Sequence, residues 1–539
     1  NGGALDDERL QVVVQDGRNH LLTTKKKYDV ITADPIHPWA YGAAYLYTTE
    51  YYAMIREHLA ENGVMCQWMP TYELAEENLR SITASFARNF EHNQLWQTAF
   101  DAVLIGSTAP IVVDLASLAE RLRQPRVAEQ LSRIGIEDPL SFLSEFTMDD
   151  AGVRRFAEGG PINSDDNLYL EFSSPLSIGT PDGGSNIRLI DSYRRSPRSI
   201  VSDWSPLFAS QTEVDRALDA HLWAKRQTVA ASAELEDAVL EPAVDSWEKV
   251  IGRLRAVLDE VPGYGRARVQ LASALTGRGR AEMAAGDLER AERSFRDALE
   301  AAPRDAHAHF NLGLALLNQG LAIEALQHFD HTLARRPRYP RGYLAQAAAL
   351  AELGRHDEAV LQYQRAVKLE PQNAQAHFEL AVALTRRQRF SRAVEHYEGA
   401  LALDPRHLDA RDNLSLVYTM LGRHAEAIRL LRDGLDQEPD HVRMTERLAW
   451  LLATTPDPEL RNGAEAVGLA ERVVRSARER LPQALKTKAA ALADVGRFEE
   501  AIATARQAAE LAQERNDPAL AARIRTHIER YEARMPLRQ

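Results

Sequence analysis

The chain has 539 residues, 45% apolar and 27% charged, a composition ordinary for a soluble globular protein with two or more domains. Its formal net charge is −13 and it has no basic block, which argues against nucleic acid as a partner because phosphate binding relies on clustered lysine and arginine. Cys66 is the only cysteine, which excludes an internal disulfide and a cysteine-based zinc cage and favours the reducing cytoplasm.

No stretch approaches 18 consecutive apolar residues, so no membrane span is predicted. The start, residues 1–5, has neither the basic nor the apolar region of a signal peptide. Because the first residue is Asn1 and not methionine, we expect a fragment or a processed product.

The first 107 residues alternate short apolar runs with amphipathic segments, which predicts a mostly parallel sheet covered by helices. Strands are expected at 9–16, 28–34, 63–70 and 101–107, and helices at 49–63 and 76–90.

Two carboxylates, Asp16 and Asp34, stand at the carboxyl ends of the first two predicted strands, where such sheets bind their ligands. They suit a nucleoside-type ligand: Asp16 can accept a hydrogen bond from an exocyclic amine, and Gly17 lets the backbone approach the ring. Pro35 and Pro38 restrict the loop that follows Asp34. The residues alone leave open that both acids only cap the turns or helices that follow.

These segments resemble the spermidine synthase family, the polyamine aminopropyltransferases. The family pattern contains D-x-R and D-G around one strand, Y-D and D around the next, an L-[FY]-x-x-x-[FY]-[FY] helix and a final G-[apolar]-x-x-Q. The matching residues are Asp7, Arg9, Asp16-Gly17, Tyr28-Asp29, Asp34, Leu46-Tyr47, Tyr51-Tyr52, Gly63 and Gln67. Residues 160–175 are similar to a segment of bacterial spermidine synthase-like proteins fused to membrane transporter-like domains.

The resemblance implies a partial methyltransferase-like, Rossmann-type doubly wound sheet over residues 1–175. It implies decarboxylated S-adenosylmethionine as co-substrate, with Asp16 and Gly17 at its adenine and no tightly bound cofactor. Asp34 then accepts a proton from a small amine acceptor, or stabilises its charge, with His37 and Gln67 beside the acceptor. Upstream membrane helices in the parent gene, as in the transporter-fused branch, would place the chain at the inner face of a membrane.

The sequence departs from the family at three points. His37 occupies the slot of the second acid that holds the diamine, so another amine or a plain loop role is left open. The P-T-Y of the family's diamine pocket has no equivalent before residue 101; the tripeptide at 70–72 lies elsewhere. The glycine-rich turn and the ribose-binding acid expected before Asp7 are missing, so we expect negligible transfer activity from this chain.

The second half is a repeat array with a period of 34. The prolines that keep this step are Pro303, Pro337, Pro371, Pro405 and Pro439. The turn glycines Gly286, Gly320, Gly354 and Gly422 keep it too, with Gln388 in the one missing slot. This pattern resembles the tetratricopeptide repeat, a helix–turn–helix unit. Regular units begin at 306, 340, 374 and 408, and the unit before them carries seven extra residues.

The predicted organisation is α/β followed by all-α. Its parts are the α/β domain at 1–175, a linker at 176–210, a helical lead-in at 211–264, an α-solenoid of about seven repeats at 265–520 and a C-terminal helix or tail at 521–539.

The solenoid predicts a protein or peptide partner, because stacked repeats form a concave groove lined by their first helices. The expected groove residues are His307, Phe310, Arg341, Leu344, Gln375, Phe378, Asp409 and Asp412. The histidines of the first regular unit fit its two helix faces, and no metal site is predicted. Two functions stay open: an aminopropyltransferase with a localising repeat module, or a non-catalytic repeat scaffold with a degenerate nucleoside-binding domain.

Overall fold

The structure, a computed structural model, describes residues 10–34, 37–98, 101–178, 183–240, 243–476 and 481–538. The motif residues Asp7, Arg9 and Pro35 lie outside the described residues. The chain divides into two compact units, residues 1–315 and 316–539, and each is described by itself. None of the described helices combines the length and the hydropathy that crossing a bilayer requires.

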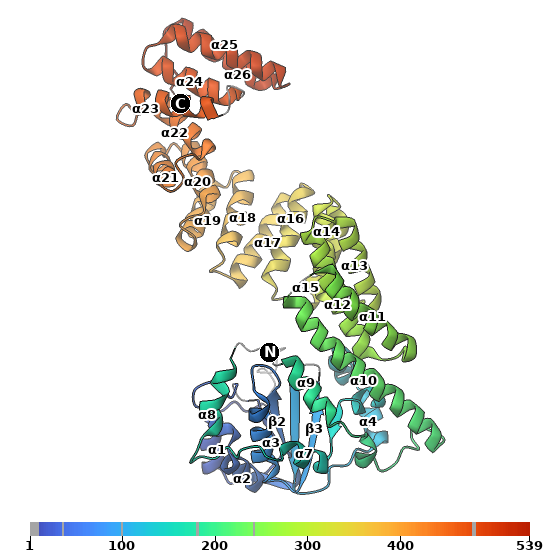
Figure 1. The fold of residues 1–539 in the computed structure, drawn as a ribbon. Coiled ribbons are helices and arrows are strands. Elements are labelled where there is room, and N and C mark those ends of the chain that lie inside the picture. Colours follow the sequence, from blue (N-terminus) through green and yellow to red (C-terminus); the bar gives the residue numbers. More distant parts are fainter. Residues whose placement is uncertain are drawn as a thin grey trace. The chain divides into compact units, whose positions relative to one another are not determined.

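A five-stranded mixed sheet lies in the first unit (Figure 1). In spatial order its strands are β1 (Tyr28–Ala33), β2 (Leu59–Pro70), β4 (Asp101–Ser107), β3 (His92–Gln97) and β5 (Phe146–Met148). Strands β1 and β2 are parallel, and the other three neighbouring pairs are antiparallel. The expectation of a mostly parallel sheet is therefore wrong, because the consecutive strands β3 and β4 pair directly and need no crossover helix.

The strand expected at 9–16 does not form in its described part, residues 10–16. Val12, Val13 and Val14 are exposed, Val14 at 99%. No described strand pairs with this segment, and a strand exists only where a neighbour completes its backbone hydrogen bonds. The apolar pattern of the segment predicts a strand, but the segment does not form one because no described strand lies beside it.

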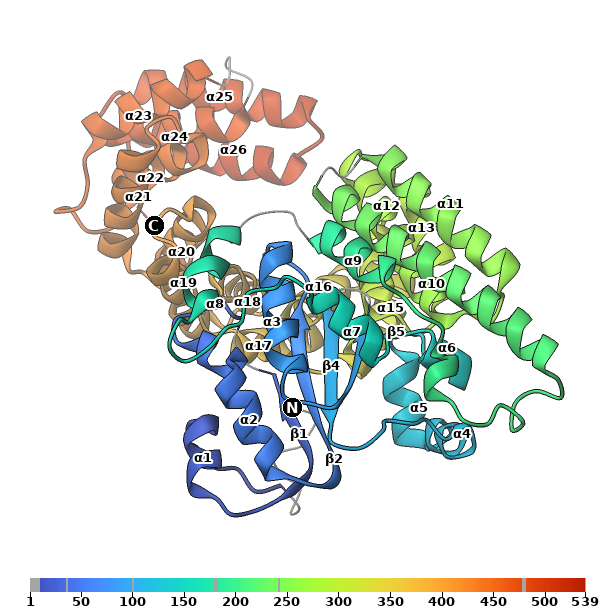
Figure 2. The same cartoon turned by 60° about the horizontal axis from the view of Figure 1, so that its bottom comes forward.

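Helices cover one face of the sheet (Figure 2). They are α2 (Thr49–His58), α3 (Glu76–Ala87) and α7 (Asp150–Ala157). Along β2 the side chains alternate: Met65, Gln67 and Met69 are buried toward these helices, whereas those between them are half-buried on the opposite face. The helix expected at 49–63 ends at His58, where β2 begins.

Shorter elements complete the α/β part. They are α1 (Gly17–Thr23), η2 (Ala43–Tyr47), α4 (Leu115–Leu122), α5 (Pro125–Ser132), α6 (Pro139–Leu143), α8 (Tyr169–Ser173), η3 (Ser174–Ser177), α9 (Gly183–Ser192) and η4 (Pro197–Ile200). The expected linker at 176–210 thus contains α9 and η4, with Ile187, Ile190 and Ile200 buried. The domain boundaries stay a prediction.

A run of helices follows in the same unit. They are α10 (Gln211–Leu240), α11 (Val244–Glu260), α12 (Gly265–Ala284), α13 (Leu288–Ala301) and α14 (Ala306–Asn318), which continues into the second unit. A buried charge cluster joins them to the α/β part. Lys225 of α10 lies 2.7 Å from Glu145 next to β5, and Arg266 of α12 lies 2.9 Å from the same carboxylate.

The second unit consists of antiparallel helix pairs. They are α15 (Ala322–Arg335), α16 (Pro340–Glu352), α17 (His356–Leu369), α18 (Ala374–Arg386), α19 (Phe390–Leu403), α20 (Leu408–Met420), α21 (His424–Gln437), α22 (Val442–Thr454), α23 (Gly463–Ser476), α24 (Pro482–Asp494), α25 (Phe498–Glu514) and α26 (Pro518–Glu532). First helices begin at 306, 340, 374 and 408, so the predicted repeat starts are confirmed.

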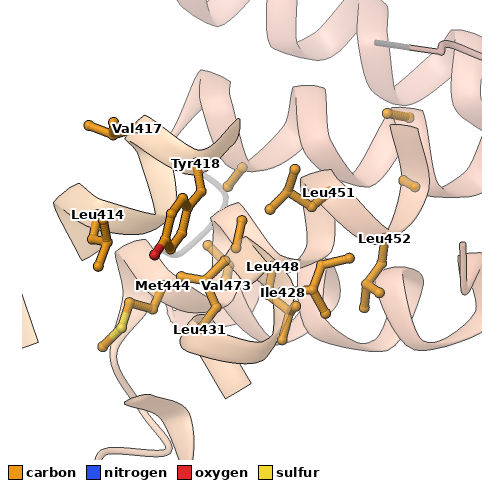
Figure 3. Close-up of a cluster of buried hydrophobic side chains, with 14 of the residues drawn as sticks. Leu414, Val417, Tyr418, Ile428, Leu431, Met444, Leu448, Leu451, Leu452 and Val473 are labelled. Carbon is orange, nitrogen blue, oxygen red and sulfur yellow. The ribbon is translucent and has the colours of Figure 1, made fainter. Parts of the chain in front are cut away.

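Bulky side chains from successive helices fill the space between the repeats (Figure 3). The labelled cluster contains Leu414, Val417, Tyr418, Ile428, Leu431, Met444, Leu448, Leu451, Leu452 and Val473, from α20 to α23. Small residues such as Ala427 let the helices approach closely, as the repeat pattern requires.

Candidate functional site

Asp34 is the first residue after β1, at the carboxyl end of a strand whose Ile31 and Ala33 pack against the core. Its side chain is exposed. This placement agrees with the expectation that the sheet presents Asp34 at its rim.

The strand register places three polar or aromatic side chains on one face of the sheet. Thr32 lies opposite Cys66 in β2, so Asp34 follows at the level of Trp68. On the other side of β2, Trp68 lies opposite Val103 and Pro70 lies opposite Asp101. Because side chains alternate along a strand, Asp34, Trp68 and Asp101 share the face that α2, α3 and α7 leave uncovered.

Asp101, the first residue of β4, belongs to this group by register and by its electrostatic interaction with Asp34. Its Oδ1 atom is buried and accepts no hydrogen bond from the described residues. Burial raises the pKa of Asp101, and the negative charge of nearby Asp34 raises it further.

Three aromatic rings lie close to the imidazole of His37. His37 stacks on Trp39 with ring centroids 4.3 Å apart, and it contacts Trp68 and Tyr72 with centroids 5.4 Å and 5.5 Å away. The His37 Nδ1 atom is buried and has no hydrogen-bond partner within the described ranges. Burial, Asp101 and Asp34 all raise the pKa of the Tyr72 phenol. We call these four residues, His37, Trp39, Trp68 and Tyr72, the ring group.

Gln67 lies on the other face of the sheet. It is fully buried in the layer of Met65 and Met69, and its amide donates to the Trp68 backbone carbonyl at 2.9 Å. The structure therefore does not place the Gln67 side chain with Trp68, and its expected role beside the acceptor stays a prediction.

Asp16 caps a helix. Its carboxylate accepts a hydrogen bond from the backbone N–H of Asn19 at 2.8 Å, at the start of α1. The interpretation of Asp16 as a strand-end acid is wrong, because the preceding residues form no strand. Gly17 has open space where a side chain would begin, so no close approach requires glycine there. The donor-binding role of both residues stays a prediction.

Asp16 and Asp34 nevertheless act on neighbouring phenols. Burial and then Asp16 raise the pKa of Tyr51 to about 12, and burial and then Asp34 raise the pKa of Tyr47. The buried Tyr47 hydroxyl has no hydrogen-bond partner in the described part of the chain.

The expected groove residues divide by exposure. His307, Arg341, Gln375 and Asp409 are exposed, and Leu344 and Phe378 are half-buried. Phe310 and Asp412 are buried, so the expectation that they face a groove is wrong. Asp412 forms an ion pair with Arg447 of α22 at 3.0 Å, so this acid links two neighbouring repeats.

Sequence reasoning missed Asp101 and most of the ring group. Trp68 follows Gln67 directly, and Tyr72, the last residue of the tripeptide that was expected to lie elsewhere, contacts His37. The alternation of side chains along β2 places Trp68 on the face opposite Gln67, and this pattern in the sequence could have identified Trp68. Asp101 begins β4, whereas the ligand-binding acids of a parallel sheet are expected at the carboxyl ends of strands.

Residues 1–112 match the family model described as spermine/spermidine synthase domain. Similar proteins are polyamine aminopropyltransferases of Korarchaeum cryptofilum (36% identical over 64 residues, 12% of this chain and 20% of that protein), Saccharolobus solfataricus (30% over 113 residues, 19% and 38%) and Pseudomonas aeruginosa (30% over 105 residues, 20% and 36%). The chain thus spans 20% to 38% of the length of these relatives.

Three tetratricopeptide repeat models match residues 276–340, 347–386 and 384–451. Solved structures that resemble the chain include MamA (22% identical, 30% of this chain and 94% of that one, TM-score 0.29) and YrrB, described as a TPR protein with an unusual peptide-binding site (23%, 33% and 91%, TM-score 0.30). The chain therefore carries a spermine/spermidine synthase domain match at residues 1–112, followed by tetratricopeptide repeats.

Proposed function

We propose that the face bearing Asp34 and the ring group is the acceptor half of an aminopropyl-transfer site. The donor of the reaction is decarboxylated S-adenosylmethionine, and the acceptor is a small amine. The observation that carries this proposal is the exposed Asp34 at the carboxyl end of β1, beside four rings that can enclose an amine. The match of residues 1–112 and the names of the relatives support the same class of reaction.

The chemistry requires a carboxylate at this position. A primary amine is protonated at neutral pH and has no free electron pair for attack. Asp34 accepts the proton, the nitrogen forms a bond to the aminopropyl carbon, and the carbon–sulfur bond breaks to leave a neutral thioether. A positioned base of this kind contributes roughly 10²–10⁴-fold to the rate.

The ring group suits the cationic form of the amine before this step. A cation over an aromatic face gains about 0.5–2 kcal/mol, more when water is excluded. His37 carries no negative charge, so in the proposed site it acts as a wall of the acceptor pocket and not as an ammonium-binding acid. Asp16 and Gly17 remain the proposed contacts of the donor. The single cysteine of the chain supports a location in the reducing cytoplasm.

The test is amine binding by the whole chain, since binding the acceptor needs only this half of the site. Calorimetric titration with butylamine is expected to show binding that Asp34→Asn weakens at least tenfold. The matched control is Glu61→Gln, an exposed acid near the other end of β2, which is expected to bind as the parent does. No binding by the parent chain, or equal binding by Asp34→Asn, would favour the non-catalytic scaffold.

We also propose that the repeats bind a protein segment. The supporting observation is the mixed polar surface of the first helices, where Arg341, Gln375 and Asp409 are exposed. A photo-crosslinking residue at Gln375 is expected to capture a partner that the same residue at Lys368, exposed on a second helix, does not capture. Equal capture at both positions would contradict a groove-specific partner.

A further inference from the structure

Two histidines of one repeat face each other in the second unit. His377 lies on α18 and His396 lies on α19, the two helices of the repeat that begins at 374. Their Nδ1 atoms are 3.2 Å apart, and their ring centroids are 5.1 Å apart with the ring planes at 54° to each other. The transfer reaction proposed above does not involve this pair.

The distance between the two nitrogens is the distance between neighbouring ligands of a metal ion. Zinc binds an imidazole nitrogen at about 2.0–2.1 Å. Two such nitrogens at neighbouring positions of a tetrahedral or octahedral ion are therefore roughly 2.9–3.4 Å apart. The Nδ1 atoms of His377 and His396 already have this separation. An ion can bind both rings after they turn in place, and α18 and α19 need not move.

The proton between the two rings does not prevent this binding. Without a metal, one ring donates its Nδ1–H to the unprotonated Nδ1 of the other ring. Both residues are half-buried, which leaves water access to the rings. The donating ring can therefore lose the proton at Nδ1 and take one up at its own Nε2. Both rings then stay neutral, and the ion replaces the one hydrogen bond between them.

Gly399, one turn after His396 on α19, leaves space for the two rings to meet. A methyl group at position 399 would lie 2.8 Å from Nδ1 of His377, so a larger residue would push this ring away. Glycine is unfavourable inside a helix, and the same slot of the next repeat, 34 residues later, holds Asp433. The space beside the two nitrogens is therefore particular to this repeat and its neighbour does not share it.

We propose that His377 and His396 bind a divalent transition-metal ion, of the class of zinc, nickel or copper, through their Nδ1 atoms. Imidazole nitrogen is a preferred ligand of these metals, whereas magnesium and calcium prefer oxygen. Within the described residues, no group of three or more histidine, cysteine, aspartate or glutamate side chains is placed to hold a metal ion. Water therefore completes the coordination of this ion, which joins the two helices of one repeat.

The repeat array supplies matched replacements for both histidines. The preceding repeat has Tyr343 and Gln362 in the same two slots, each 34 residues earlier. These residues lie on the packed helices α16 and α17, so His377→Tyr and His396→Gln are expected to fold. The matched control is His356→Gln, which removes a half-buried histidine at the start of α17.

The experiment titrates Zn²⁺ into the whole chain by calorimetry and counts the sites. The repeat that begins at 306 also has histidine in both slots, so more than one site can be counted. We expect His377→Tyr and His396→Gln each to lose one zinc site or to weaken it at least tenfold, because losing a ligand costs at least as much as losing a residue that orients one. His356→Gln should bind zinc as the parent does, and excess Mg²⁺ should leave the site unchanged.

A crystal of the whole chain soaked in zinc chloride locates the ion by its anomalous scattering, and it decides the question even where a variant fails to fold. We expect zinc about 2.0–2.1 Å from both Nδ1 atoms. No zinc at this pair, or equal zinc binding by the parent and both variants, overturns the inference and leaves only a hydrogen bond between two rings. Loss of the site in only one variant also overturns it, because the ion requires both ligands. The proposed transfer function stands or falls separately, by the amine titration.

Discussion

His37 stacks face to face on Trp39, with ring centroids 4.3 Å apart and ring planes within 3° of parallel. In the family pattern the slot of His37 holds an acid, and the stack explains what the histidine does in its place. The imidazole forms one wall of the ring group, and its edge approaches Trp68 and Tyr72. A ring therefore stands in the loop after β1 where the family pattern has a charge.

The first prediction concerns this wall. His37→Phe keeps a ring that can stack on Trp39, whereas His37→Ala removes it. Ring pairs of this kind contribute about 0.5–1.5 kcal/mol, so His37→Ala is expected to bind butylamine about three- to tenfold more weakly. His37→Phe should bind within about twofold of the parent in the same calorimetric titration. If Phe is as damaging as Ala, the imidazole nitrogens and not the ring are what matter.

The second prediction concerns the repeat turns. Gln388 stands where the other repeats have glycine, and its φ is +55°, in the left-handed region that costs residues with a side chain about 1–2 kcal/mol. We expect Gln388→Gly to raise the free energy of unfolding by about 1 kcal/mol, after subtracting the greater flexibility of glycine in the unfolded chain.

The matched control is Gly354→Ala, at the equivalent turn with φ +73° and no atom near the new methyl. It should lower the free energy of unfolding by about 1 kcal/mol. Urea denaturation measures both changes. A urea midpoint lower for Gln388→Gly than for the parent would show that the Gln388 side chain makes contacts that outweigh the backbone strain.

The third prediction concerns pH. Burial lowers the pKa of Lys225 to about 8, although the carboxylate of Glu145 opposes this, whereas an exposed lysine has a pKa of about 10.5. Between these values the unfolded chain binds a proton that the folded chain has released, so stability increases as the pH rises above about 8.

Lys225→Met isolates this effect because it removes only the lysine. The free energy of unfolding of the parent, minus that of Lys225→Met, is expected to increase by about 1 kcal/mol per pH unit between pH 8 and pH 9.5. Denaturant titrations at several pH values measure the difference. Parallel curves for the two proteins would mean that Lys225 titrates normally.

The fourth prediction concerns Asp412, which is 1% exposed and pairs with Arg447 of the next repeat at 3.0 Å. Asp412→Asn leaves a partly buried guanidinium without its carboxylate and should cost about 3 kcal/mol in the free energy of unfolding. Asp409, on the same helix as Asp412, forms an exposed ion pair with Arg443. Asp409→Asn removes this pair and should cost less than about 1 kcal/mol in the free energy of unfolding. Equal costs in urea denaturation would contradict the distinction between the two acids.

The repeats could be predicted because their signal is periodic and local. Helix starts at 340, 374 and 408 follow from a 34-residue step, and the left-handed turn at Gln388 follows from its slot among glycines. Strands β1, β2 and β4 could be predicted for a similar reason, since their apolar patterns are strong.

The sheet topology could not be predicted because a strand pattern does not name its partner. The valines at 12–14 have a good strand pattern and no neighbour, whereas β3, with the sequence HNQLWQ, has a weak pattern and pairs with both β4 and β5. Asp34 was found because it ends a strand. The place of Asp101 on the same face as Asp34 was not predicted because it depends on the antiparallel pairing of β4 with β2.

The most direct test of this account is a crystal structure of the chain soaked with butylamine. The account predicts the nitrogen within hydrogen-bond distance of the Asp34 carboxylate, with the carbon chain against the ring group. An amine bound elsewhere, with the Asp34 carboxylate free, would contradict the claim that this acid receives the amine.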